Sequence, residues 1–412
     1  MNVQLRCPLA AALALALGHA GAATINVDIA GDAHVSGRCT LREAIAAANT
    51  HATPADTNCA AGSSSGGNTI AIPPSLSPIE LVGAALDIAD TGGTTLVHSA
   101  VSGTQVAVRR VAGSDSVFSA SQPATFEDLA ISGGHGGMAG GGVAGGSTTV
   151  TLRRCLVHDN VSQYFSGGVT IGQGGTLNVI DSTVSNNQSS EFGNGGGIGV
   201  NLATLTLTGS TVSGNSSSVG GGIFAWSSTL AIHSSTVSGN VATNQGGGIR
   251  VYGSVAFELV HSTIAANAAP HGAGVLVYDN PTTGTLVTAR NSLLWGNTGS
   301  ADIEHMGGMS DIIGGGYNLI GQIGDLISYP ANTLRCDPQL RPLAWNGGPT
   351  WTHALPANSC AVDSGGVVPS ANYDQRGAGH PRWMGTQVDI GAYEYNPNDP
   401  DYDRIFANGF EP

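Results

Sequence analysis

A parallel β-helix is the fold class that the sequence predicts. Near-copies of one segment, clearest in LTLTGSTVSGN (residues 205–215) and LAIHSSTVSGN (residues 230–240), recur every 25 to 30 residues. A unit of this length buries its apolar face only by stacking on its neighbours, which is how a solenoid is built. With 62 glycines in 412 residues, the chain also favours short strands and tight bends over helices. A β-propeller is the competing periodic fold, but its blades need about 40 residues.

Each repeat begins with two predicted strands that are separated by a corner. Apolar residues alternate over the first strand, and their parity changes before the second, as a turn of the chain requires. The apolar columns are Val150, Leu177, Leu205, Leu230, Phe257 and Val287; Leu152, Val179, Leu207, Ile232, Leu259 and Ala289; and Val157, Val184, Val212, Val237, Ile264 and Leu294. Cys155 stands in a column otherwise made of serine, so we interpret it as a small buried residue and not as a redox group.

One asparagine ends each repeat and predicts a structural ladder. We expect these residues to adopt left-handed backbone geometry at a sharp bend, with each side-chain amide bonded to the amide one coil away. Stacked strands lie about 4.8 Å apart, which suits such a ladder. The six residues are Asn160, Asn187, Asn215, Asn240, Asn267 and Asn297.

A glycine cluster and a third short strand follow the polar loop after each asparagine, giving two or three strands per coil. With Ile223, Ile249 and Val275 facing inward, alternation turns Phe224, Arg250 and Leu276 outward, and Trp226, Tyr252 and Tyr278 with them. Exposed aromatic rings can stack on sugars and often mark partner sites. The predicted binding residues are therefore Phe224, Trp226, Arg250, Tyr252 and Tyr278. The alternative is that these rings only stabilise their sheet or lie under a loop.

The N-terminal end of the solenoid has one predicted helix, within residues 39–50. Thr40 can cap it and Glu43 completes a capping box. Its apolar stripe, which can cover the first coil, comprises Leu41, Ala44, Ile45 and Ala48. Two disulfides are hypothesised near the chain ends of an exported protein, Cys39 with Cys59 and Cys336 with Cys360.

The first 22 residues have the features of a signal peptide. Arg6 supplies the positive charge, residues 9–17 an apolar run too short to span a membrane, and residues 20–22 an A-x-A-like cleavage site. We therefore expect an exported chain with no membrane span after cleavage, secreted or at the outer cell surface. A formal charge of −14 argues against nucleic acid as a partner. We expect a monomer.

Both ends also resemble known exported proteins. CTLREAI (residues 39–45) resembles the CSLREA motif of bacterial β-helix proteins. GYNLIG, DPQLRPLAWNGGPTWTHAL, AVDSG, DQRG and DIGAYE, in that order within residues 316–394, resemble the choice-of-anchor Q domain. The GGGI and SGN pairs resemble the repeats of polymorphic outer membrane proteins. The resemblance implies a right-handed parallel β-helix that is exported, often surface-associated and without an established activity.

These features divide the chain into five predicted parts. They are a signal peptide (1–22), an N-terminal cap (23–67), the single-stranded β-helix (68–330), a choice-of-anchor Q-like C-terminal cap (331–396) and an acidic tail (397–412) ending in RIFANGFEP.

Pectate lyases and polygalacturonases share this pectin-lyase-like architecture, so catalysis is the main alternative function. Glycoside hydrolysis needs two carboxylates on either side of the bond that is cleaved, and lyase chemistry needs clustered carboxylates with a basic residue. The candidates are Asp181, Glu258, His261 and Arg290, which the repeat alignment scatters over different positions. Asp181 is expected to pair with Arg154 on the neighbouring coil. The alternating Asp399, Asp401 and Asp403 lack the glycine and glutamate of a calcium loop, so no metal or other cofactor is expected.

The leading hypothesis is an exported, surface-associated and non-enzymatic β-helix, an adhesin-like scaffold that binds a glycan or a cell-surface partner. A polysaccharide lyase or glycoside hydrolase is the second hypothesis, and a purely structural surface rod is the third.

Overall fold

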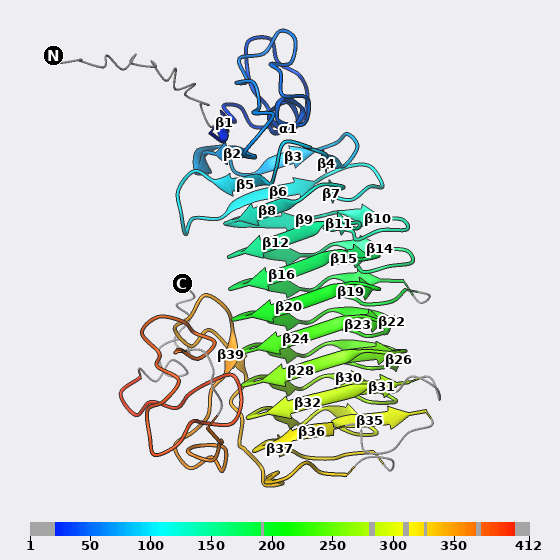
Figure 1. Ribbon diagram of the computed structural model, residues 1–412, viewed down its shortest axis with the longest axis vertical. Coiled ribbons are helices and arrows are strands. Elements are labelled where there is room, and N and C mark those ends of the chain that lie inside the picture. The colour runs from blue at the N-terminus through cyan, green and yellow to red at the C-terminus, as the bar shows by residue number, and fades with distance from the viewer. Residues whose placement is uncertain are drawn as a thin grey trace, which may run out of the picture.

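The structure, a computed structural model, describes residues 21–190, 193–279, 285–307, 313–324, 328–367 and 372–399. Its strands stack into four parallel sheets, here named A to D, that run along a parallel β-helix (Figure 1). The predicted signal peptide, up to residue 20, and the tail beyond residue 399 lie outside the described residues. Of the helices described, none has the length and apolar character that a membrane crossing requires.

Sheets A and B follow each other around each coil and correspond to the two strands predicted for each repeat. Sheet A comprises β1 (Ala23–Asn26), β2 (Asn68–Ile72), β5 (Thr95–Ser99), β8 (Ala124–Glu127), β12 (Thr149–Arg153), β16 (Thr176–Ile180), β20 (Thr204–Thr208), β24 (Thr229–His233), β28 (Ala256–Val260), β32 (Leu286–Arg290) and β36 (Ile313–Gly316). Sheet B comprises β3 (Ile79–Leu81), β6 (Val106–Arg110), β9 (Leu129–Ser132), β13 (Leu156–His158), β17 (Thr183–Ser185), β21 (Thr211–Ser213), β25 (Thr236–Ser238), β29 (Thr263–Ala265), β33 (Leu293–Trp295) and β37 (Leu319–Ile320).

The return path of each coil contains two further sheets, one more than the sequence predicts. Sheet C, the predicted third strand, comprises β4 (Leu86–Ile88), β7 (Phe118–Ala120), β11 (Val143–Gly145), β15 (Val169–Gly172), β19 (Ile198–Asn201), β23 (Ile223–Trp226), β27 (Ile249–Tyr252), β31 (Val275–Tyr278) and β35 (Ile303–Met306). Sheet D comprises β10 (His135–Gly136), β14 (Val161–Ser162), β18 (Gln188–Ser189), β22 (Ser216–Val219), β26 (Val241–Gln245), β30 (Ala268–Ala269) and β34 (Thr298–Gly299). Sheet D replaces the expected polar loop, because the stacked asparagines hold the residues after them at strand spacing.

The apolar columns fill the interior in register. Leu177 of β16 pairs with Leu205 of β20, which pairs in turn with Leu230 of β24, and all three are buried. The same core includes Cys155, whose next neighbour in the column is the buried Ser182. Burial of matched columns on successive coils fixes the register, since a slip by one residue would turn every apolar side chain outward.

The six asparagines form the predicted hydrogen-bonded ladder, but the residue with left-handed backbone geometry is the one before each asparagine. The side-chain amide of Asn187 donates to Oδ1 of Asn215 at 3.0 Å, and the same bond repeats from Asn160 to Asn297. Positive φ angles fall instead on the residue before each asparagine: Asp159, Asn186, Gly214, Gly239, Ala266 and Gly296. The expectation of left-handed asparagines is therefore wrong, because their side chains point inward while the preceding residue makes the turn.

A second column of left-handed residues connects sheet A to sheet B. This A–B bend column comprises Asp128, Arg154, Asp181, Gly209, Ser234, His261 and Asn291. A positive φ at non-glycine residues is uncommon and marks a position that the surrounding structure imposes.

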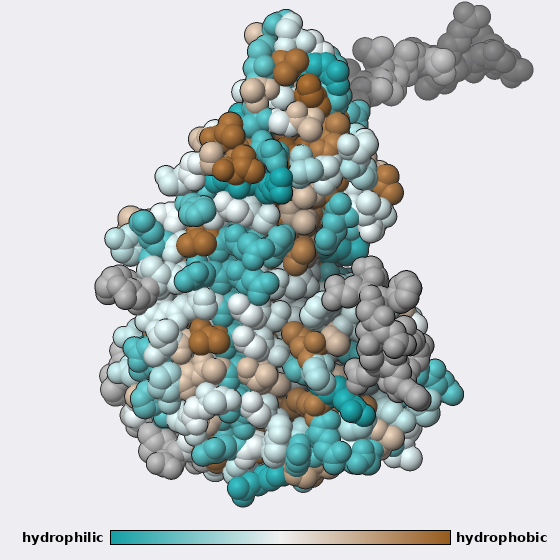
Figure 2. All heavy atoms as spheres, turned by 180° about the vertical axis from the view of Figure 1, so that it is seen from behind, coloured by the Kyte–Doolittle hydropathy of each residue, from teal (hydrophilic) through white to brown (hydrophobic). Residues whose placement is uncertain are grey.

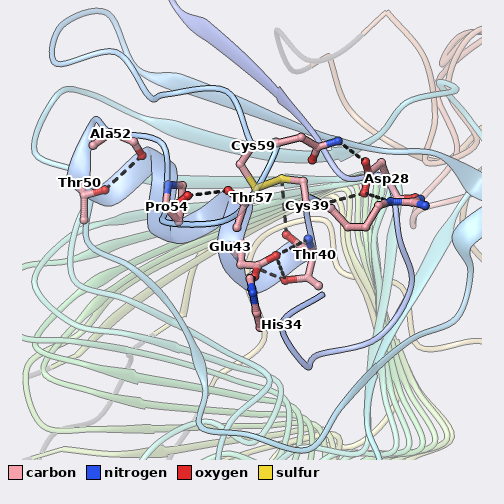
Figure 3. Close-up of a disulfide and its surroundings, with 12 residues drawn as sticks. Asp28, His34, Cys39, Thr40, Glu43, Thr50, Ala52, Pro54, Thr57 and Cys59 are labelled. Atoms are coloured by element: carbon pink, nitrogen blue, oxygen red, sulfur yellow. Dashed lines mark hydrogen bonds and ion pairs between the residues drawn. A yellow bond between two sulfur atoms is a disulfide. The ribbon is translucent and has the colours of Figure 1, made fainter. Parts of the chain in front are cut away.

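The N-terminal end is closed by α1 (Leu41–Thr50), which begins with the predicted capping box. Thr40 accepts from the amide of Glu43, and the Glu43 carboxylate accepts from the amide of Thr40. The helix buries Leu41, Ala44, Ile45, Ala47 and Ala48. The Cys39–Cys59 disulfide ties the start of α1 to the segment that follows it (Figure 3). A single 3-10 turn, η1 (Pro74–Leu76), lies after β2.

The C-terminal segment, residues 331–396, lies alongside the lower coils and not only across the open end (Figure 1). Its one small sheet pairs β38 (Leu343–Ala344) with β39 (Thr352–His353) in antiparallel fashion, and a Cys336–Cys360 disulfide closes it. It buries a second apolar cluster against the outer faces of Leu293 and Leu319 in sheet B. The segment packs sideways because sheet B turns apolar side chains outward on these last coils.

Candidate functional site

The predicted binding residues lie on the outer face of sheet C and form a continuous surface. We call Phe224, Trp226, Arg250, Tyr252 and Tyr278 the aromatic stripe. Trp226, Tyr252 and Tyr278 pair in register on successive strands and are 44%, 38% and 36% exposed. The rings of Tyr252 and Tyr278 stack with centroids 5.4 Å apart and 24° between their planes. The rings thus stand as a column that open solvent can reach.

Arg250 lies at the centre of the stripe, and its contacts are aromatic. Its guanidinium carbon is 5.6 Å from the ring centroid of Phe224, 5.3 Å from that of Tyr252 and 5.8 Å from that of Tyr278. Among the residues described, no carboxylate pairs with it, and its buried Nε has no hydrogen-bond partner. Burial lowers the pKa of the guanidinium, and the two tyrosines oppose this effect.

Leu276 departs from the expected outward pattern. It is fully buried although it pairs with Arg250 in register. A Cβ at Gly272 would lie 2.6 Å from the Cβ of Leu276, so the glycine bend sits directly on this side chain. The stripe therefore ends in the phenol of Tyr278 and does not extend over an exposed leucine.

Two of the catalytic candidates, Glu258 and Arg290, lie on the outer face of sheet A. Glu258 contacts His233 of the preceding strand at 3.3 Å, and both side chains are close to half exposed. Arg290 is exposed one strand further on and pairs in register with Val260. An exposed Glu–His pair on a flat sheet provides no enclosed site for proton transfer.

His261 is buried in the A–B bend column under the C-terminal segment. Its Nε2 is 3.4 Å from Nδ2 of Asn291, whose side chain also bonds the backbone of Gly366. Desolvation lowers the pKa of His261 to about 3, and the Arg382 charge adds to this effect. The imidazole is neutral and out of reach of a substrate, so the structure does not support His261 as a catalytic base.

Asp181 occupies the same column three coils earlier, about 14 Å away at the usual strand spacing. The expected ion pair with Arg154 is wrong. Arg154 instead turns to the preceding coil, where Nε and Nη2 bond the two oxygens of Asp128 at 2.8 and 2.9 Å and Nη2 also bonds Glu127. Two carboxylates on one side outweigh one on the other. The four catalytic candidates therefore do not meet.

Asp181 does line a groove that the sequence did not reveal. The groove encloses about 980 Å³ between sheet B and the C-terminal segment. Its far wall includes Trp345 and Trp351, which are more than 160 residues from Asp181 in the chain. The richness of the C-terminal segment in tryptophan was the one signal available. On the face shown in Figure 2, hydrophobic side chains form small separate groups among hydrophilic ones.

The stacked coils, the inward asparagine ladder and the lateral C-terminal segment define a parallel β-helix protein. A family model described as periplasmic copper-binding protein (NosD) matches residues 97–305, just over half of the chain, so the chain belongs to the NosD family.

Among solved structures, the crystal structure of pectate lyase Pel9A is similar, with a TM-score of 0.54 and 14% sequence identity. The match covers 91% of this chain and 98% of that one, and it shows the fold. No curated protein matches the sequence.

Proposed function

We propose that this protein is an exported, non-enzymatic β-helix that binds an acidic glycan through the aromatic stripe. The observation that carries the proposal is Arg250, a half-buried cation with three aromatic neighbours and, among the described residues, no carboxylate partner. A sugar carboxylate or sulfate would supply that partner, and the flanking rings would stack on the sugar faces.

Export is supported by the periplasmic description of the family and by the two disulfides, which form in oxidising compartments. Display at the outer surface rests on the CSLREA and choice-of-anchor Q resemblances and remains part of the proposal. A signal peptide within residues 1–22 is proposed on the same basis.

Copper binding, which the family description names, is not supported by the potential metal ligands among the described residues. Copper prefers clustered imidazole, thiolate or thioether ligands. Within the described ranges, no three His, Cys, Asp or Glu side chains come together in a way that could hold a metal ion. The one free thiol described, Cys155, is buried in the core. We therefore propose no copper-dependent role.

Glycan retention by the purified mature chain tests the proposal. We expect saturable binding to polygalacturonate, without release of unsaturated or reducing ends. The double variant W226A/Y252A should abolish retention, and R250A should remove the preference for acidic over neutral chains and its sensitivity to salt. Tyr164→Ala is the matched control, because Tyr164 is an exposed aromatic residue that follows β14 and is not part of the stripe.

Three results would contradict the proposal. Turnover of the polymer would favour a lyase or hydrolase. Equal retention by the wild type and W226A/Y252A, with unchanged circular dichroism, would show that the stripe is not the glycan-binding site. Absence of binding to any acidic glycan would favour a purely structural rod.

A further inference from the structure

The groove beside Asp181 exists because the C-terminal segment covers only part of sheet B. Three threonines in one outward column bond this segment: Thr211 donates to the carbonyl of Trp351, Thr236 to the side chain of Gln375, and Thr263 accepts from the amide of Ala392. The next threonine upstream, Thr183, is left uncovered and becomes floor of the groove. The edge of the segment therefore lies at the level of β21, where Thr211 bonds Trp351, and His353 of β39 contacts Ser238 of the next strand, β25.

The floor of the groove is polar and repetitive. Its accessible hydroxyl-bearing side chains come from adjacent strands, Thr183 and Ser185 from β17 and Ser213 from β21, whereas the hydroxyl of Thr211 is buried and bonded to the C-terminal segment. Hydroxyls both donate and accept, so such a floor can bond a chain of hydroxyl groups in several registers.

The wall is aromatic and held on the small antiparallel sheet. Trp351 precedes β39 and is 53% exposed, while Trp345 follows β38 and donates from Nε1 to the carbonyl of Gly348 at 2.8 Å. Both line the groove. Indole faces at the edge of a polar cleft suit the apolar faces of sugar rings.

Asp181 supplies a carboxylate at the bend edge of the groove. Among the residues described, nothing donates a hydrogen bond to its side chain, although it is only partly exposed. Burial raises the pKa of this carboxyl, and Arg153 and Arg154 oppose the rise. A partly desolvated acceptor without a donor is suited to bonding a pair of ligand hydroxyls.

Asp128, two coils away from Asp181 and also in the groove lining, is placed differently. It is 2% exposed and both of its oxygens bond Arg154. Glycoside hydrolysis needs a second free carboxylate that can activate water or attack the sugar. Because Asp128 can do neither, the groove is equipped for binding and not for cleavage.

The local charge selects the ligand class. Arg153 and Arg154 face three carboxylates, Asp128, Glu127 and Asp181, so the surroundings of the groove keep a net negative charge within a chain of formal charge −14. A polyanion would be repelled here, whereas uncharged hydroxyls would not.

We propose that this groove is a second, independent carbohydrate site that binds a neutral oligosaccharide, with Trp351 and Trp345 stacking on its rings and Asp181 accepting from its hydroxyls. The site does not depend on the aromatic stripe, which lies on sheet C and is proposed to take an acidic ligand.

Calorimetric titration of the full mature chain with neutral hexasaccharides of glucose, mannose and xylose, and with hexagalacturonate, tests the proposal. We expect saturable binding of at least one neutral ligand, weaker binding of hexagalacturonate to this site, and affinity losses of about tenfold in W351A and D181A. Trp351→Ala should leave docking intact because Thr211 bonds the backbone carbonyl of Trp351.

Trp383→Ala is the matched control, since Trp383 is also 53% exposed but lines a different cavity. R250A should keep the affinity of this site for the neutral ligand and weaken only the binding of the acidic one, which separates this site from the stripe. The proposal is overturned if no neutral hexasaccharide binds, if W351A and W383A bind equally well, or if the bound oligosaccharide is cleaved.

Discussion

Asn187 and Asn215 share one hydrogen-bonding arrangement that repeats along the solenoid. Oδ1 of Asn215 accepts from both the backbone amide and the side-chain amide of Asn187, at 2.9 and 3.0 Å. Nδ2 of Asn215 donates in turn to the carbonyl of Val184 and to Asn240. Each asparagine thus serves two coils, so the ladder joins successive coils through buried polar groups that are satisfied only together.

Removal of one member of the ladder should therefore destabilise the solenoid strongly. Asn215→Ala leaves the backbone amide of Asn187 buried without an acceptor and its side-chain amide with one of two bonds, to Val157, for a loss of about 2–3 kcal/mol. Chemical denaturation followed by circular dichroism measures the loss. Asn178→Ala is the control, because Asn178 lies on the outer face of β16 with one long bond, 3.4 Å, to Thr151. Similar losses in both variants would show that the ladder carries no special stability.

Gln375 is one of the side chains that fasten the C-terminal segment to the coils. It accepts from Thr236 at 2.6 Å and donates to Thr211 at 2.9 Å, and it also bonds Thr350 within its own segment. We expect Gln375→Ala to loosen this docking and to expose residues 331–396 to protease, while the β-helix keeps its circular dichroism. Gln339→Ala, at an exposed position of the same segment, is the comparison. Equal cleavage rates in the two variants would rule out this fastening role.

The repeated apolar columns made the fold predictable, because the same buried position recurs as an apolar residue in successive coils. Contacts between distant segments leave no such pattern. Thr211 and Trp351 lie 140 residues apart, and nothing local indicates that one bonds the other. The groove depends on that docking and therefore could not be predicted from the sequence.

The sequence also leaves open which neighbouring coil a side chain contacts. Arg154 has Asp128 one coil before it and Asp181 one coil after it in the bend column, at the same strand spacing. The choice depends on Glu127, which adds a second carboxylate on one side only. Asp181 is left free as a consequence, and the candidate site gains its acceptor.

Cys155 should behave as a serine analogue inside the core. Burial raises the pKa of its thiol to about 12, so little thiolate forms near neutral pH. We expect no maleimide labelling of the native protein and complete labelling after denaturation. Cys155→Ser should change the stability by less than about 1 kcal/mol. The serines in this column donate to the carbonyl two residues back, as Ser182 does to Ile180, and Arg153 offers the same carbonyl here. Rapid native labelling would contradict the buried position.

Glu394 should make the C-terminal segment sensitive to rising pH. It is 1% exposed, it accepts from the backbone amides of Asp389 and Met384, and burial raises its pKa from the ordinary 4.5 to about 8. The folded state therefore holds a proton that the unfolded state releases between these two values. The contribution of Glu394 to the stability is therefore greatest below about pH 4.5, falls as the pH rises to about 8 and then levels off, whereas the buried neutral His261 contributes in the opposite direction up to its ordinary pKa of 6.5.

Thermal melting of the wild type and Glu394→Gln across this range measures the effect. Relative to the wild type, the variant should gain stability as the pH rises from about 4.5 to about 8, because the glutamine cannot ionise, while Asp389 and His261 titrate in both proteins. Glu80→Gln, at a partly exposed position in β3 where Glu80 pairs with Arg109, should keep the full wild-type slope. An E394Q profile parallel to that of the wild type between about pH 4.5 and pH 8 would show that Glu394 is ionised in the folded protein at neutral pH.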